Sequence, residues 1–265
     1  MANEIDIHIS KEQVAELPTV KFEGDITLID RPEDVREAVA YLRSQPLVGF
    51  DTETKPNFRK GMSNTVSLMQ VSSEERSFLF RLNKIGFCDE LREFMECEDV
   101  LKVGLSLKDD FHMLHQIGSF EQANFVELQD MVKEFRITDA SLQKIYAILF
   151  GERISKAQRL TNWEAATLTP AQMAYASLDA WACQRIYRLL EQGTWRPEES
   201  PYAVPHVEET ITPEQAEKRA RRKLERQQRK ERRAAARDAE ATQATPARKR
   251  TRQRKRPTPP PPPAN

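Results

Sequence analysis

Two acidic residues at the end of an apolar run are the first candidates for chemistry in this sequence. Asp51 and Glu53 follow residues 47–50 (LVGF), a continuous apolar run typical of a strand buried on both faces. Residues i and i+2 of a strand point to the same side, so the two carboxylates would repel each other unless a cation lay between them. Hard divalent ions such as Mg²⁺ prefer such oxygen ligands. The same three letters, DTE, also fit a turn that carries two solvated acids.

A third carboxylate, Asp110, follows a predicted strand at 100–107 and stands in the first turn of a helix predicted from about 109 to 117. The helix dipole alone favours an acid at this position, so Asp110 taken singly fits a structural role better than metal binding. His112 and His115 lack the HExxH spacing of a zinc-binding helix, and we interpret them as structural or surface groups.

A tyrosine and an aspartate share one face of the last predicted helix, at residues 169–192. Tyr175 and Asp179 are four residues apart, which places them about one helical turn from each other. Asp179 therefore lies beside the apolar stripe of that helix, where an unpaired carboxylate is costly. The stripe consists of Ala174, Leu178, Ala182 and Ile186. A metal ion or a basic partner would explain the acid, and a surface acid beside a core aromatic is the alternative.

The elements that must position these groups alternate between strands and helices. Predicted strands lie at 25–30, 47–50, 66–71, 77–82, 100–107 and 124–128, and predicted helices follow Pro32 and lie at 89–95, 109–117, 141–150 and 169–192. Early strands in antiparallel order, followed by alternating helices and strands, indicate an α/β domain with a mixed sheet. The sequence has no GxGxxG or GxxxxGK segment, so Rossmann and P-loop nucleotide binding have no support.

Taken in order, the motifs resemble the DEDD superfamily of 3′–5′ exonucleases. They are DxE at 51–53, an aspartate six residues after Gly104, and YxxxD at 175–179, which resembles the tyrosine subclass. The histidine subclass has a His five positions before the last Asp, where this chain has Ala174. The segments VGFDTET, VSLMQVSS, KVGLSLKDD and ISKAQRLTNWEAATLTPAQMAYASLDAW look most like the ribonuclease D and Werner-type branch. The resemblance covers about residues 25–192 and implies a ribonuclease-H-like fold, a mixed β-sheet flanked by helices.

This resemblance implies a catalytic set and a cofactor. Two divalent ions, Mg²⁺ or Mn²⁺, would promote hydrolysis of nucleic acid from its 3′ end and release nucleoside monophosphates. Asp51 would bridge both ions, and Tyr175 would orient or deprotonate the attacking water, orientation being the safer role because an ordinary phenol titrates near pH ~10. The family spacing selects Asp110 rather than its neighbour Asp109. The implied metal ligands are Asp51, Glu53, Asp110 and Asp179.

Four further residues are candidates for contact with the substrate. Gln70, together with the backbone near Thr52 and Thr54, would face the terminal nucleotide. Trp163 follows a polar segment and could stack on a base. A loop anchor packed on the domain is an equally good interpretation of Trp163. DNA or RNA with a free 3′ end fits as the substrate.

The zero net charge of the 265-residue chain hides a division in composition. Residues 211–265 carry 18 basic and six acidic residues, whereas residues 1–210 carry 23 basic and 35 acidic ones. Leu224 is the only large apolar residue after position 211. Such a segment cannot bury enough surface to fold alone. We therefore expect an N-terminal extension (1–24), an exonuclease domain (25–205) and a disordered, basic, proline-ending tail (206–265).

The tail leads to predictions about partners. Its basic residues suit the phosphate backbone of nucleic acid, and its proline run at 259–263 suits a protein partner; an inert solubilising tail is the other interpretation. A catalytically silent nucleic-acid-binding or scaffold protein acting through the tail is the alternative function. The intact set of acids argues against it, because a protein without activity would be free to lose a carboxylate.

The remaining composition bears on location. No apolar run approaches the roughly 18 residues that a membrane span needs, and the N-terminus lacks the apolar core of a secretory signal. The cysteines are widely spaced and form no CxxC pair, which argues against a disulfide framework or a zinc site. They are Cys88, Cys97 and Cys183. We expect no membrane partner and a cytoplasmic location, with association with the nucleoid as a second possibility.

Overall fold

A computed structural model describes residues 5–56, 65–206 and 221 of the chain. The predicted tail lies outside the described residues, apart from His206 and Arg221. Its disorder therefore stays a prediction. Among the described residues, no helix combines the length and the apolar character needed to cross a membrane. The three cysteines are free thiols, and the cytoplasmic location stays a prediction.

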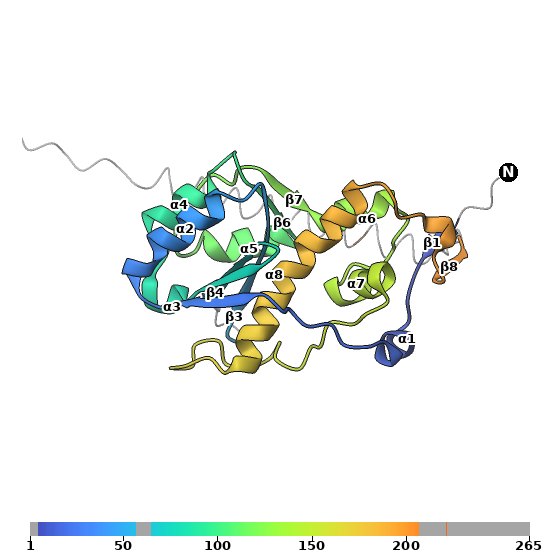
Figure 1. Cartoon of the computed structure of the whole chain (residues 1–265), viewed down its shortest axis with the longest axis horizontal. Helices are drawn as coiled ribbons and strands as arrows, with labels where there is room; N and C mark the ends of the chain where they lie inside the picture. The colour runs from blue at the N-terminus through green and yellow to red at the C-terminus, as the bar shows by residue number, and fades with distance from the viewer. Residues whose placement is uncertain (1–4, 57–64, 207–220, 222–265) are drawn as a thin grey trace, which may run out of the picture. The chain divides into compact units, whose positions relative to one another are not determined.

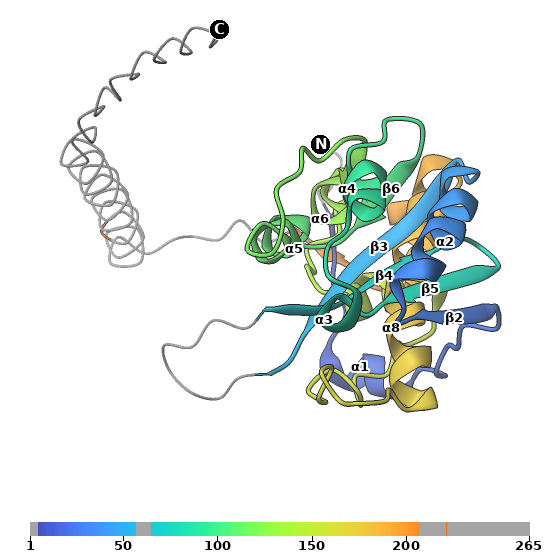
Figure 2. The ribbon, with the colours of Figure 1, turned by 90° about the vertical axis from the view of Figure 1, so that its left-hand side faces the viewer.

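A six-stranded mixed sheet forms the centre of the described domain (Figures 1 and 2), with the strand order β2-β5-β4-β3-β6-β7. β3 pairs antiparallel with β4, and β4 with β5, whereas the β2–β5, β3–β6 and β6–β7 pairs are parallel. The strands are β2 (Asp25–Ile29), β3 (Leu47–Thr54), β4 (Val66–Ser72), β5 (Arg76–Phe80), β6 (Leu101–Gly104) and β7 (Phe125–Glu127). The predicted mixed sheet is therefore confirmed.

Helices cover both faces of this sheet, because strand residues alternate between the faces. Residues of α2, α3, α4 and α5 join one hydrophobic cluster with Phe50 and Val71, and residues of α6, α7 and α8 join a second one. The helices are α2 (Val35–Arg43), α3 (Leu82–Ile85), α4 (Asp89–Met95), α5 (Leu107–Leu114), α6 (Leu128–Glu134), α7 (Leu142–Phe150) and α8 (Pro170–Glu191). The short 3-10 helices are Pro32–Asp34 and Pro197–Glu199.

The predicted elements are all present, with several displaced boundaries. The strand predicted at 47–50 extends to Thr54, so Asp51 and Glu53 lie within β3, and the helix predicted to reach 117 ends at Leu114. The strand predicted at 100–107 ends at Gly104, and the following helix begins at Leu107 instead of near 109. Ser106 causes this difference, because its φ of 66° is left-handed and incompatible with a continuing strand. No sequence pattern predicted α1 (Lys11–Glu16), α3, α6, the 3-10 helix Pro197–Glu199 or two short strands.

The N-terminal segment is part of the same folded unit in its described portion. β1 (Ile5–Ile7) pairs antiparallel with β8 (Ala203–Pro205), and α1 (Lys11–Glu16) follows it. Ile7 and Ile9 are completely buried among residues of α6, α7 and α8. Residues 5–24 thus contribute core side chains. The division between an N-terminal extension (1–24) and an exonuclease domain (25–205) stays a prediction.

Gly49 allows α8 to lie directly on β3. A Cβ atom at this position would stand 1.7 Å from the carbonyl oxygen of Ala180, a backbone atom of α8. The helix carries Asp179 next to Ala180, and the strand carries Asp51 two residues after Gly49. This close approach therefore brings two of the candidate ligands together.

We expect Gly49→Ala to destabilise the domain by about 2–3 kcal/mol, because the added methyl group must push α8 off the strand. The melting temperature should fall by roughly 4–12 °C for a domain of this size, measured by calorimetry. Gly193→Ala is a suitable control, since it meets open space and carries only the strain of a φ of 63°. Equal losses for the two variants would contradict the packing argument.

Candidate active site

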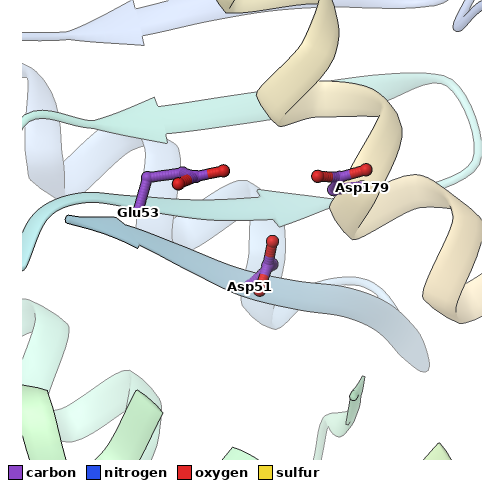
Figure 3. Close-up of side chains that lie close together, drawn as sticks. All are labelled: Asp51, Glu53 and Asp179. Atoms are coloured by element: carbon purple, nitrogen blue, oxygen red, sulfur yellow. The ribbon is translucent and has the colours of Figure 1, made fainter. Parts of the chain in front are cut away.

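Three carboxylates from two distant parts of the chain converge at the end of β3. Asp51 and Glu53 come from the strand and Asp179 from α8, and one oxygen of each lies within 4.8 Å of the others. Figure 3 shows the three side chains pointing toward one another in the space between strand and helix. The local sequence accounts for part of this placement, because β3 puts residues i and i+2 on one side. Asp179 lies in α8, nine residues after the helix begins at Pro170. Thr169 caps that helix in a capping box with Gln172.

Asp110 lies beside this cluster. Its carboxylate accepts a short hydrogen bond from the Thr52 hydroxyl, which joins the first turn of α5 to β3. Asp110 is buried, whereas the adjacent Asp109 is exposed. The ambiguity between the two acids is thus resolved as the family spacing predicts: the acid that faces the site is Asp110. Thr54 lies at a β-bulge in the register of β3 with β4, at the open end of the strand.

Burial dominates the electrostatics of all four acids. It raises the pKa of Asp51 well above its ordinary value, and the charges of Asp110, Asp179 and Glu53 raise it further. Burial likewise raises the pKa of Glu53 to about 8, and the pKa values of Asp110 and Asp179 to about 7. Hydrogen bonds from Thr52 to Asp110 and from Tyr175 to Asp179 oppose this rise. A bound cation would relieve the repulsion that these shifts record.

This arrangement predicts a pH dependence of stability in metal-free buffer. A group whose pKa is higher in the folded state than in the unfolded chain stabilises the fold at low pH, and this contribution is lost as pH rises through the folded pKa. The free energy of unfolding should therefore fall between about pH 5 and pH 9, as Asp110, Asp179 and then Glu53 ionise. The check is the melting temperature in EDTA across that range.

Divalent ions should reverse this trend, because they bind the ionised carboxylates and stabilise the folded state by mass action. Mn²⁺ should raise the melting temperature more at pH 8 than at pH 6. A flat or rising stability curve in EDTA, with no effect of Mn²⁺, would show that the acids are not a coupled ligand set.

Tyr175 stands one turn before Asp179 on α8, as the sequence predicted. Its hydroxyl interacts with the Asp179 carboxylate and lowers the pKa of that acid, against the effect of burial. Burial and the charges of Asp179 and Glu53 raise the pKa of the phenol above its ordinary value. The orienting role of Tyr175 stays a prediction.

Two predicted substrate contacts are corrected by the structure. Gln70 is completely buried opposite Asp51 in the sheet register, and its amide nitrogen lies 3.3 Å from an Asp51 oxygen. It supports the acid and has no surface to offer a nucleotide. Trp163 is also completely buried, packed with Leu68 and Leu168. Its ring is covered on all sides, so the alternative interpretation, a loop anchor, is the one that the structure bears out.

Lys156 and Arg159 are site residues to which we assigned no role from sequence. Both line the same cavity of about 350 Å³ as Asp51, Glu53 and Asp179. Their charges lower the pKa of Asp179, opposing the effect of its burial. They lie within the segment ISKAQRL, which carried part of the family resemblance, but no spacing rule identifies a cation that faces acids across a cavity.

The segment that carries these cations is anchored firmly to the domain. Trp163 is its apolar anchor, and the buried guanidinium of Arg81 donates hydrogen bonds to the carbonyl oxygens of Ala165 and Ala166. Lys55, just after β3, forms an ion pair of 3.0 Å with Glu164. Contacts with Arg81 and Lys55, together with the buried Trp163, therefore hold this segment, which carries Lys156 and Arg159, against the domain.

Comparison with known proteins identifies the domain. A family profile described as 3′–5′ exonuclease matches residues 26–194. The mouse (Mus musculus) bifunctional 3′–5′ exonuclease/ATP-dependent helicase WRN is 28% identical over 184 residues, which are 66% of this chain and 13% of the relative. Ribonuclease D of Gluconacetobacter diazotrophicus is 28% identical over 169 residues, 63% of this chain and 42% of the relative.

A solved structure is similar in fold. The EXO domain of Aedes aegypti Nibbler superimposes with a TM-score of 0.59 at 21% identity, covering 68% of this chain and 97% of that one. The chain spans less than half the length of the two curated relatives above. Because the profile covers more than half of the chain, the chain belongs to the family of 3′–5′ exonucleases, in agreement with the DEDD resemblance of its motifs.

Proposed function

We propose that this protein is a metal-dependent 3′–5′ exonuclease that removes nucleoside monophosphates from the 3′ end of DNA or RNA. One observation carries the proposal: the carboxylates of Asp51 and Glu53, which are half-buried, and of Asp179, which is buried, converge within 4.8 Å. Family membership supports the same reaction class.

The donor set suits divalent metal ions. Carboxylate oxygens are the ligands that Mg²⁺ and Mn²⁺ prefer. A cation nearby would stabilise the ionised forms of these four half-buried or buried acids, whose pKa values are raised. Asp51, Glu53 and Asp179 would hold one ion, and Asp110 with Asp51 would hold the second. When bound, two such ions would lower the pKa of the attacking water and stabilise the leaving 3′ oxygen.

The other residues of the site act on the substrate and on the water. In the reaction, a water oxygen attacks phosphorus and the bond to the 3′ oxygen breaks, giving a nucleoside 5′-monophosphate and a strand shortened by one nucleotide. Tyr175 orients the water through its hydroxyl, and the bond to Asp179 fixes the phenol. Lys156 and Arg159 line the cavity and attract the phosphate that enters it.

A direct assay tests the proposal. The full chain is incubated with Mg²⁺ or Mn²⁺ and single strands of DNA and RNA of the same sequence, each labelled at the 5′ end. We expect a ladder that shortens one nucleotide at a time, nucleoside 5′-monophosphates as products, and no ladder from strands blocked at the 3′ end. Intact strands with both metals, or a ladder that starts from the 5′ end, would overturn the proposal. The DNA and RNA arms decide the substrate class.

A further inference from the structure

We propose that a second cavity, next to the catalytic one, binds a backbone phosphate of the nucleic acid strand upstream of the terminal nucleotide, through Arg136. The inference rests on the proposed exonuclease function and adds a binding site for the substrate to it.

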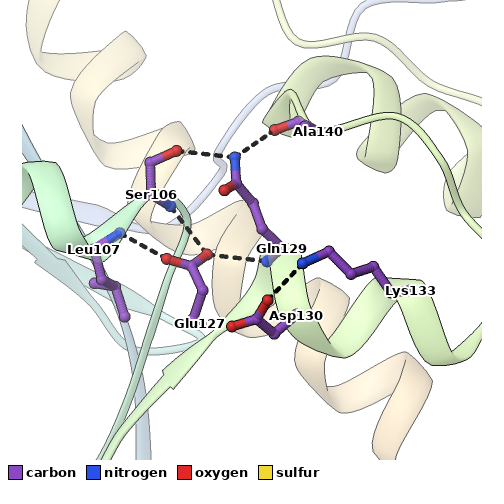
Figure 4. Close-up of polar contacts among 7 residues, drawn as sticks. All are labelled: Ser106, Leu107, Glu127, Gln129, Asp130, Lys133 and Ala140. Carbon is purple, nitrogen blue, oxygen red and sulfur yellow. Dashed lines mark hydrogen bonds and ion pairs between the residues drawn. The ribbon is translucent and has the colours of Figure 1, made fainter. Parts of the chain in front are cut away.

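The two cavities share a wall. The second cavity measures about 430 Å³, and Ala140 lines both it and the catalytic cavity. The side-chain amide of Gln129 lines the second cavity and donates to the Ser106 hydroxyl (3.0 Å) and the Ala140 carbonyl oxygen (2.9 Å). Figure 4 shows this amide lying between Ser106 and Ala140. The second cavity therefore lies next to the one that would hold the 3′ end of a bound strand, within reach of the nucleotides just upstream.

The acids of the second cavity are already engaged. Asp6 is paired with His206 at 2.9 Å. Asp139 accepts a hydrogen bond from the backbone N–H of Ile9 and is paired with Lys144 at 2.7 Å. Lys144 therefore offsets the negative charge of Asp139, the acid that lies nearest to Ala140 in the sequence.

Arg136 is the available cation of this cavity. It is exposed, and among the described residues its guanidinium makes no ion pair; its one recorded side-chain bond is a 3.5 Å contact to the Ile5 carbonyl oxygen. Lys133 also lines the cavity, but it is paired with Asp130 at 2.6 Å (Figure 4). A guanidinium with most of its N–H groups free is suited to binding a phosphate through two hydrogen bonds.

The backbone of Arg136 is an independent indication. Its φ is 60°, and it occupies the position just after the end of α6 where glycine or asparagine is usual. The N–H groups of Arg136 and Ile137 bond to the carbonyl oxygens of Lys133 and Val132, and the Arg136 carbonyl accepts from Ile7. A large side chain is thus kept in a left-handed conformation that glycine would adopt without strain. Such outliers are concentrated at functional sites.

The variant Arg136→Gly separates the two roles of this residue, because relief of strain and loss of phosphate binding act in opposite directions. The probe is a six-nucleotide single strand bound to the full chain in EDTA, followed by fluorescence anisotropy. We expect the Kd to rise about five- to tenfold at low salt, and the plot of log K against log salt to become shallower by roughly 0.7. The melting temperature should be unchanged or higher. Arg136→Asn, which also tolerates this backbone, should behave alike.

Turnover provides the second readout. The KM for the six-nucleotide strand should rise with kcat unchanged, and hydrolysis of a dinucleotide, which fills only the catalytic cavity, should not change. Arg36→Gln is the control. The Arg36 side chain is 86% exposed on α2, and α2 packs in the hydrophobic cluster of Phe50 and Val71, whereas α6 packs in the second cluster. Unchanged binding of the six-nucleotide strand by Arg136→Gly, or an equal effect of Arg36→Gln, would overturn the proposal. Failure of the wild-type chain to hydrolyse any strand would instead overturn the exonuclease function, since binding is measured without metal.

Discussion

Asp51→Asn is expected to abolish exonuclease activity while raising the stability of the metal-free protein. The carboxylate lies at the centre of the acidic cluster, where burial and three neighbouring acids raise its pKa. Asparagine keeps the shape of the side chain and removes the charge. The rate should fall by several orders of magnitude. A neutral amide binds divalent ions much more weakly than a carboxylate does, and Asp51 would be the ligand shared by both ions.

The gain in stability has the same origin as the loss of activity. Burial and the neighbouring acids disfavour the ionised form of Asp51 in the folded protein. An asparagine carries no charge and avoids this cost, so the melting temperature in EDTA at pH 8 should rise above that of the wild type. It should also depend less on pH. Mn²⁺ should stabilise the variant less than the wild type, because the ion loses its central ligand.

Asp109→Asn is the matched control, since it makes the same chemical change at an exposed acid. It should leave both the activity and the metal response close to those of the wild type. A variant Asp51→Asn that unfolded in metal-free buffer would indicate a structural role for Asp51. One that kept full activity would remove the residue from the catalytic set.

Tyr175→Phe is expected to lower the turnover rate by about 10²–10⁴, the usual effect of removing a positioned acid–base or orienting group. The ring stays in its packing site near Trp163, where the two ring centroids are 6.1 Å apart. Only the hydroxyl and its bond to Asp179 are lost. The fold should therefore be retained, with circular dichroism spectra identical to those of the wild type.

The pH dependence of the remaining rate distinguishes the two roles of the phenol. If the hydroxyl orients water, the pH–rate profile of Tyr175→Phe should keep its shape at a lower level. If the phenol acted as the base, the rise in rate with pH that accompanies its deprotonation would be lost from the profile. Tyr187→Phe, on the same helix and outside the acidic cluster, is the control and should keep normal turnover. A normal rate for Tyr175→Phe would reduce Tyr175 to a core aromatic.

Local patterns were enough to predict most of the secondary structure and the acids. The apolar run before Asp51, the i, i+4 spacing of Tyr175 and Asp179, and the alternation of strands and helices depend on a few consecutive residues. Strand and helix periodicity act over the same range, so these elements agree with the structure. Ser106 is the exception, because a left-handed serine between a strand and a helix gives no distinct signal in the sequence.

The environment of each side chain was decided by tertiary structure. Gln70 and Trp163 are polar or amphipathic residues next to motif segments, which made them candidates for substrate contact. Their complete burial results from the sheet register and from the packing of the loop before α8. Neither is visible in a linear pattern, because the burial partners are far away in the sequence.

The sequence by itself determined which acids could form a site, since their types and spacings are written in it. Only the tertiary structure decided that α8 touches β3 at Gly49, that Asp110 faces inward while Asp109 faces solvent, and that Arg159 lies across a cavity from the acids. The same holds for Arg136, whose left-handed backbone is held by bonds to Ile7 and to the end of α6. Contacts between residues more than a hundred positions apart depend on the packing of whole elements, and local propensity carries no information about them.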